Sequence, residues 1–212
     1  MKLQGKKVGI LIESDFYEPE IWYYQHRFAE EGIAVDFLTR MWGQSFIEFK
    51  GHEFHIAGTF AEKSLEGMSD EELASYSAII VPAGMVADRL RYTEDVSKIP
   101  PATEFMRRAF ANKNVIKGII CHGMWLIAPA PELVRGRPVV VHNNLHGDAL
   151  NMGAIYTDQD VVIDGDLVTA RTGGHCHQFA RAIIDLMAAK ENAGVSSSET
   201  ETRSTVESGL SS

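Results

Sequence analysis

The chain has 212 residues, which is enough for one domain with a substantial core and short for two. Its residues are 45% hydrophobic and 23% charged, as in ordinary globular proteins, and its net charge of −9 argues against binding nucleic acid or anionic membranes through a basic field. Two cysteines are too few for a disulfide framework, and no apolar run is long enough to span a bilayer. We therefore expect a cytoplasmic protein without membrane or nucleic-acid partners.

Short apolar runs alternate with helical patterns along most of the chain. The apolar runs predict buried strands at residues 7–12, 35–39, 78–81, 115–120 and 138–142. The helical patterns predict helices at residues 20–31, 103–112, 124–128 and 179–190, with a capped helix start at residue 69. This alternation predicts a doubly wound, mostly parallel sheet whose binding sites lie at the carboxyl ends of the strands.

Two segments predict hairpins, and the end of the chain predicts disorder. Residues 46–56 are expected to turn at Lys50-Gly51, and residues 161–169 at Asp164-Gly165, where a type I′ turn needs positive φ. One domain is expected over residues 1–192. Residues 193–212 are rich in Ser, Thr, Glu and Gly without apolar periodicity, which predicts a disordered tail.

The segment Gly118–Gly123 carries the strongest chemical signal. Its strand runs directly into Cys121-His122-Gly123, and a nucleophile on a sharp strand-to-helix turn is lifted clear of the backbone. A position near a helix N-terminus favours the thiolate, so we expect Cys121 to titrate below an ordinary thiol. The alternative is a buried cysteine that serves only as a small core residue.

Four segments together resemble the ThiJ/PfpI superfamily, which contains the Parkinson-associated deglycase and the PfpI intracellular proteases. The resemblance covers residues 5–190 and rests on four segments: Asp15–Glu20, Val81–Gly84, Cys121–Gly123 and Arg135–Arg137. It implies a flavodoxin-like α/β fold of the class I glutamine amidotransferase type and a homodimer or higher homo-oligomer. Two departures stand out: Ala83 replaces a glycine of the usual Pro-Gly-Gly, and the segment Thr172–His177 is unusually rich in histidine.

The resemblance implies a set of catalytic residues around Cys121. Glu20 matches the carboxyl group beside the nucleophile, where a protonated carboxyl would donate to the thiolate and stabilise it; the alternative is an ordinary acid at a helix start. His122 is the expected general acid or base. Asp88 would orient His122, often from a neighbouring subunit, and its alternative is an exposed aspartate at a helix start.

Backbone groups and further histidines complete the expected pocket. The N–H groups of Gly84, Met85 and His122 are expected to hold the oxyanion, with His142 and His175 lining the substrate site. His142, His146, His175 and His177 could alternatively form a zinc site. We expect no metal and no cofactor.

The family resemblance implies cysteine-dependent chemistry. We expect a glyoxalase or deglycase type of reaction on small reactive carbonyls or glycation adducts, with Cys121 as the nucleophile. One alternative is a PfpI-type peptidase or amidase acting on a peptide or amide, and another is a stress protein that senses oxidants or acts as a chaperone without turnover.

Overall fold

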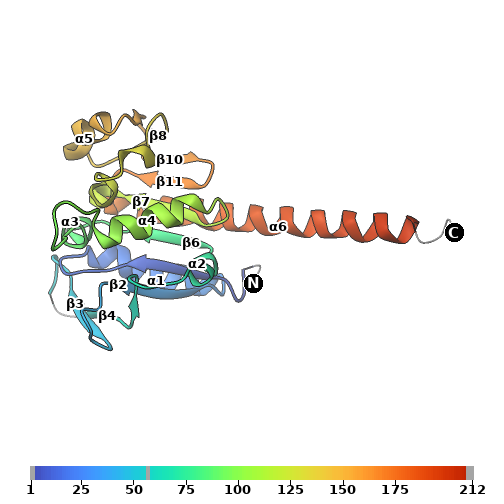
Figure 1. The fold of residues 1–212 in the computed structure, drawn as a ribbon, viewed down its shortest axis with the longest axis horizontal. Helices are drawn as coiled ribbons and strands as arrows, with labels where there is room; N and C mark the ends of the chain where they lie inside the picture. Colours follow the sequence, from blue (N-terminus) through green and yellow to red (C-terminus); the bar gives the residue numbers. More distant parts are fainter. Residues whose placement is uncertain (1–2, 56–57, 209–212) are drawn as a thin grey trace.

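The computed structural model describes residues 3–55 and 58–208, with side chains described through residue 193. At its centre lies a seven-stranded sheet in the order β10-β11-β7-β6-β1-β2-β5 (Figure 1). Neighbouring strands run parallel, except that the edge strand β10 is antiparallel to β11. The strands are β1 (Lys7–Leu11), β2 (Ala34–Thr39), β5 (Lys63–Ser64), β6 (Ala78–Val81), β7 (Ile116–Ile120), β10 (Val161–Asp164) and β11 (Leu167–Ala170).

Apart from the short edge strand β5, the parallel strands follow the order β2-β1-β6-β7-β11, which is the flavodoxin order, so the predicted fold class is confirmed. Two small two-stranded sheets accompany the main one. They are formed by β3 (Ile47–Lys50) with β4 (Gly58–Ala61), and by β8 (Pro138–Val139) with β9 (Ile155–Tyr156).

The helices pack against this sheet with apolar stripes. In α1, Ile21, Tyr24 and Phe28 are buried at helical spacing, and α1 packs against α6, which covers β7 and β11. The helices are α1 (Glu18–Glu30), α2 (Asp70–Ala74), α3 (Val86–Leu90), α4 (Pro101–Ala111), α5 (His146–Asn151) and α6 (Cys176–Ser208). Short 3₁₀ helices are η1 (Cys121–Ile127), η2 (Pro131–Leu133), η3 (Asn143–Leu145) and η4 (Gly173–His175).

Four local predictions differ from the structure. The strand expected at 138–142 is only two residues long, and the helix expected after Cys121 is a 3₁₀ helix. The expected turn at Lys50-Gly51 is instead a longer connection between β3 and β4. In the β10–β11 hairpin only Gly165 of the two central residues has positive φ, so the turn follows the type II′ pattern, not type I′.

The domain boundary predicted at residue 192 is not tested by the structure. Helix α6 continues through Ser208 (Figure 1), while the tail was expected to lack structure from residue 193. Residues 209–212 of that expected tail lie outside the described residues. Among the described helices, none combines the length and the apolar character needed to cross a membrane.

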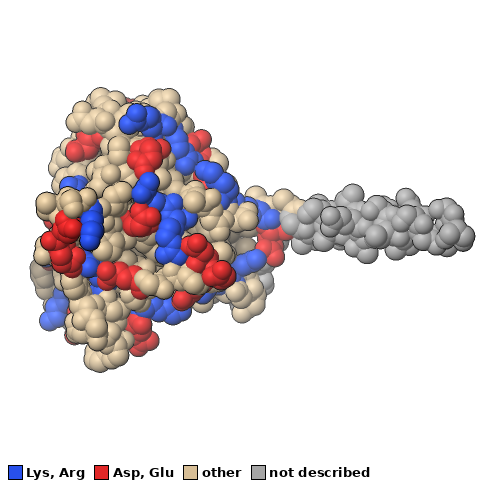
Figure 2. Space-filling model, in the orientation of Figure 1, with Lys and Arg blue, Asp and Glu red and all other residues tan. Residues whose placement is uncertain are grey.

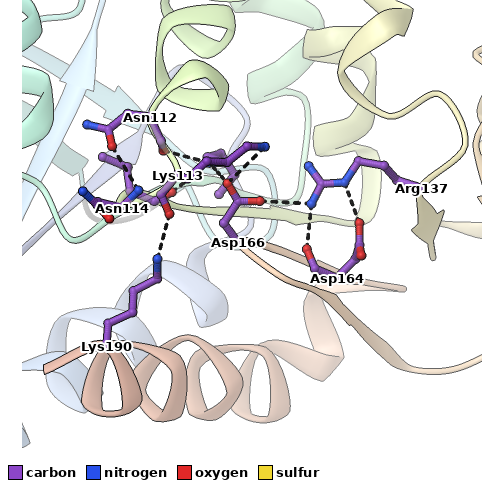
Figure 3. Close-up of polar contacts among 9 residues, drawn as sticks. Asn112, Lys113, Asn114, Arg137, Asp164, Asp166 and Lys190 are labelled. Atoms are coloured by element: carbon purple, nitrogen blue, oxygen red, sulfur yellow. Dashed lines mark hydrogen bonds and ion pairs between the residues drawn. The ribbon is translucent and has the colours of Figure 1, made fainter. Parts of the chain in front are cut away.

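A polar cluster lies at the edge of the sheet where β7 and β11 begin (Figure 3). Lys117 on β7 is fully buried, and its Nζ donates to the carbonyl oxygens of Asn112 and Val115 and, at 2.5 Å, to Asp166. The other oxygen of Asp166 accepts from Arg137 at 3.0 Å. Burial lowers the pKa of Lys117 to about 8 even though Asp166 opposes this. Burial also raises the pKa of Asp166, but Lys117 and Arg137 outweigh it and hold that pKa below its usual range.

Surface charge on the face shown in Figure 2 is mixed, because basic and acidic side chains alternate there without a large field of one sign. This agrees with the excess of acidic over basic residues in the sequence, whose net charge is −9.

Candidate active site

Cys121 lies on a strained turn at the carboxyl end of β7. Its φ is +60°, a value that non-glycine residues rarely adopt, and its side chain is only 8% exposed. Two residues later the backbone passes close to β6: a Cβ on Gly123 would stand 2.8 Å from the Val81 carbonyl oxygen. The strand-to-helix elbow expected from the sequence is therefore present, and glycine is required at position 123.

Three backbone N–H groups are directed at the Cys121 sulfur. They belong to Gly173, His122 and Gly84, and each favours the thiolate. Gly84 has φ of +87° and packs directly against the Asp15 carbonyl, so a side chain there would collide with backbone. The N–H groups of Gly84 and His122 were expected from the sequence to hold the oxyanion at this site. Gly173 was not, although the pair Gly173-Gly174 after a strand was a signal for it.

The expected oxyanion role of Met85 is contradicted by its hydrogen bond. Met85 lines the cavity, but its N–H donates to the Asp15 carbonyl at 3.0 Å and is not free for a substrate oxygen. Ala83 is also committed elsewhere, because its N–H donates to Glu20 Oε2 at 2.9 Å. Ala83 therefore does not supply an oxyanion donor, and its methyl group does not alter that function.

The protonation of Cys121 differs from the expectation. Burial raises the pKa of its thiol to about 11, the three N–H groups oppose this, and a negative charge on Glu20 would raise it further. The prediction of a thiol below its ordinary range is therefore wrong for the free protein. Desolvation of the buried sulfur is the largest contribution and outweighs the three N–H groups together.

Glu20 lies fully buried on α1. Burial raises its pKa to about 8, against smaller lowering contributions from the neighbouring Tyr24 hydroxyl and the Ala83 N–H. The carboxyl group is therefore mostly protonated at neutral pH, as the sequence reasoning expected. Its Oε1 makes no hydrogen bond of normal geometry with any described residue, although the Tyr24 hydroxyl lies close enough to the carboxyl group to lower its pKa.

Two histidines stand beside the sulfur. The Nδ1 of His122 lies 3.2 Å from Cys121 Sγ, and its ring lies 4.5 Å from that of His142 between centroids. Burial and His142 both lower the pKa of His122, so the imidazole is neutral near pH 7 and can accept a proton. His142 Nδ1 accepts from the Asn144 N–H at 3.2 Å, which places the proton of its neutral form on Nε2.

Asp88 is not brought to His122 within the chain. It is exposed on α3, and its carboxylate has no hydrogen bond or ion pair with any described residue. A role for it would require a second subunit.

The remaining histidines do not converge. His146 packs edge-on against Tyr156, His175 contacts Thr172 and Asp160, and His177 is exposed on α6. Among residues 3–55 and 58–193, no group of three or more His, Cys, Asp or Glu side chains is placed to hold a metal ion. Contrary to the sequence expectation, His175 does not line the cavity, whereas His142 does.

Cys121 lines a cavity of about 520 Å³, and only some of the other lining residues were expected from the sequence. His52 and Glu53 were missed because they come from a segment without a catalytic pattern, and Tyr17 was missed although it lies within the segment Asp15–Glu20. The lining residues are Asp15, Tyr17, His52, Glu53, Ala83, Gly84, Met85, Cys121, His122, His142, Thr172, Gly173 and Gly174.

The wall formed by His52 and Glu53 is held by the buried carboxylate of Glu18. Its two oxygens accept from the N–H groups of Glu53, Phe54 and His55 at 2.9 to 3.2 Å. Burial raises the pKa of Glu18, but these hydrogen bonds outweigh it and lower the pKa overall. Glu18 thus stays ionised at neutral pH and fixes this segment beside the cavity.

Comparison with known proteins decides the family. A sequence model of the DJ-1/PfpI family matches residues 6–186. The chain belongs to the DJ-1/PfpI family. The ThiJ/PfpI resemblance inferred from the four sequence segments is thereby confirmed.

Members of the DJ-1/PfpI family with known names or structures align over nearly the whole domain. Protein/nucleic acid deglycase 2 of Escherichia coli is 29% identical over 186 residues, which are 87% of this chain and 99% of that protein. YraA of Bacillus subtilis, named as a candidate cysteine protease, is 24% identical over 183 residues, 86% of this chain and 99% of that protein. A crystal structure of a two-domain protein from Anabaena variabilis, with DJ-1/ThiJ/PfpI-like and ferritin-like domains, has a TM-score of 0.73 and 27% identity. The match covers 85% of this chain and 47% of that one.

Proposed function

We propose that this DJ-1/PfpI protein is a cysteine-dependent enzyme that converts small reactive carbonyl compounds or glycation adducts, as glyoxalases and deglycases do. The observation that carries the proposal is the 3.2 Å contact between Cys121 Sγ and His122 Nδ1 on the elbow. Several relatives are named as deglycases, which supports an enzyme of this type.

The first step forms a covalent bond to Cys121. The thiol is protonated in the free protein, so it must lose its proton as it attacks, and neutral His122 is placed to accept it. The sulfur bonds to the aldehyde carbon, and the thiol proton passes through His122 to the former aldehyde oxygen, which gives a hemithioacetal. The N–H groups of Gly84, His122 and Gly173 stabilise negative charge at this site.

The second step moves hydrogen within the bound substrate. For a 2-oxoaldehyde, the hydrogen of the first carbon is removed as a proton and the second carbonyl oxygen is protonated, which gives an enediol. A proton is then added to the second carbon while the hydroxyl of the first carbon loses its proton, so that a 2-hydroxyacyl thioester forms. Glu20 suits this transfer, because its pKa of about 8 lets it exchange a proton near neutral pH and its Oε1 is unpartnered among the described residues. Hydrolysis of the thioester then releases the 2-hydroxy acid and restores the thiol.

The decisive test is turnover of methylglyoxal, followed as loss of substrate and appearance of D- or L-lactate. Cys121→Ser should reduce lactate formation by at least about a thousandfold. Cys176→Ser is the matched control and should leave lactate formation essentially unchanged. An active Cys121→Ser variant would show that the nucleophile is misassigned.

A peptidase or amidase is the second candidate, because the same Cys121–His122 pair could attack an amide and one relative is named as a candidate cysteine protease. In this reading Asp88 would orient His122 across an interface between two copies of the chain. Release of a fluorophore from peptide amides, with no lactate from methylglyoxal, would favour this candidate.

A further inference from the structure

A hydroxyl–imidazole–carboxylate triad lies beside the cavity. Thr172 Oγ1 is 2.9 Å from His175 Nδ1, and His175 Nε2 is 3.4 Å from Asp160 Oδ1. The three residues come from the end of β11, from η4 and from the segment that leads into β10. Their order is that of the side chains that activate a hydroxyl group in serine hydrolases.

The direction of these contacts follows from the carboxylate. The Asp160 carboxylate, 3.4 Å from Nε2, makes no hydrogen bond to the ring but attracts a proton to that nitrogen, so we assign the neutral imidazole as the Nε2–H form with Nδ1 as an acceptor. The Thr172 hydroxyl then donates to His175, and its own lone pairs remain available. Thr172 stands before η4 but makes no side-chain cap to the backbone of that helix, so its hydroxyl is committed to the imidazole.

Thr172 also has access to the reaction site. It lines the cavity that contains Cys121, and the next residue, Gly173, directs its N–H at the Cys121 sulfur. A side chain at position 173 would collide with the ring of Tyr17, so glycine allows the loop to lie this close.

Asp160, at the end of the triad away from Thr172, is held in place by Arg171 and is exposed to solvent. Arg171 donates its backbone N–H to the Asp160 carbonyl at 3.0 Å, and its Nε lies 3.5 Å from Asp160 Oδ1. The side chain of His175 is 24% exposed and that of Asp160 53%, so a proton that arrives at the imidazole can leave to water.

We propose that Thr172, with His175 and Asp160 behind it, activates the water that hydrolyses the thioester on Cys121. This inference rests on the proposed function, and it applies equally to an acyl-enzyme of a peptidase. Within this triad Thr172 is the catalytic residue, while His175 and Asp160 position and polarise its hydroxyl.

The proton transfers balance as follows. The water oxygen bonds to the thioester carbon while one water proton passes to Thr172 Oγ1 and the threonine proton passes to His175 Nδ1. The carbon–sulfur bond then breaks, the sulfur takes up the second water proton through His122, and the acid leaves as its anion. The extra proton on His175 is released to solvent.

The test separates formation of the acyl-enzyme from its hydrolysis. In a Cys176→Ser background, p-nitrophenyl acetate would acetylate Cys121 with release of p-nitrophenol, and intact mass would follow loss of the acetyl group. Thr172→Val should slow deacetylation about a hundredfold, the usual size for lost acid–base assistance, without slowing acetylation. Thr172→Ser should restore most of the rate. His175→Gln should match Thr172→Val, and the double variant should be no slower than either single variant.

His177→Gln is the matched control, since His177 is exposed two residues further along and does not line the cavity. Equal deacetylation rates in Thr172→Val and the parent protein would overturn the relay. Slowed acetylation in Thr172→Val would also overturn it, because that result means a purely structural role of the loop. A parent protein that is acetylated but forms no lactate from methylglyoxal would refute the glyoxalase reaction alone, and a Cys121 that is never acetylated would refute both.

Discussion

The Glu20 carboxyl group accepts a hydrogen bond from the Ala83 N–H at 2.9 Å, while its second oxygen has no partner among the described residues. Full burial of a group that is only half satisfied favours its neutral form, and this is why its pKa rises to about 8. The same group influences the thiols of both Cys121 and Cys176. Two measurable consequences follow from this one position.

Glu20→Gln should shift the titration of Cys121 to lower pH. Above pH 8 the carboxyl group is ionised, and its negative charge opposes formation of the thiolate. The pH dependence of iodoacetamide alkylation, read by peptide mass spectrometry, measures the shift, and Glu53→Gln is the control. A shift to higher pH would show instead that protonated Glu20 stabilises the thiolate by donating to it.

Glu20→Gln should also make the folded protein more stable at alkaline pH, where the parent loses stability. Between pH 4.5, the ordinary value, and about 8, the folded state binds more protons than the unfolded state at this position. The free energy of unfolding therefore falls as pH rises through this window, by about 1.4 kcal/mol per unit of pKa difference. Urea unfolding at pH 5 and pH 9 should show a gain for the variant at pH 9 only. An equal effect at both pH values would contradict the raised pKa.

Asp166→Asn should destabilise the fold by about 3–5 kcal/mol, the usual cost of leaving a buried charge without its partner. The charge left behind is that of Lys117, which is fully buried against Asp166. Lys117→Met is the matched control, and it should cost less because Arg137 still pairs with Asp166. Urea midpoints measure both effects, and an Asp166→Asn variant as stable as the parent would show that the buried pair does not stabilise the fold.

Asp88→Asn should lower turnover about a hundredfold if its exposed carboxylate serves His122 of a second copy. Alkylation of Cys121 should be unchanged, because nothing in the same chain links the two groups. Mixing inactive Asp88→Asn with inactive Cys121→Ser subunits should restore part of the activity. Full activity of Asp88→Asn alone would remove Asp88 from the mechanism, and a failure to complement would remove the shared site.

The sequence by itself was sufficient for the fold and for the position of the strand-to-helix elbow that carries Cys121. Alternating strand and helix patterns predict a doubly wound sheet, and the run Ile119-Ile120-Cys121-His122-Gly123 predicts the elbow, because both depend on local periodicity and local backbone conformation. Turn types, the short strand β8 and the 3₁₀ helix η1 were missed, since packing against neighbouring segments selects among conformations that are close in energy.

Only the tertiary structure decided the protonation states and the partners within the site. The sequence places Cys121 at a helix start, which favours a thiolate, but burial dominates and raises its pKa. Likewise, the Met85 N–H bonds to the Asp15 carbonyl, and Thr172 and Gly173 reach the cavity around Cys121 because β11 lies beside β7 in the sheet. Local patterns fix what a residue can do, whereas desolvation and hydrogen-bond partners depend on segments distant in the chain.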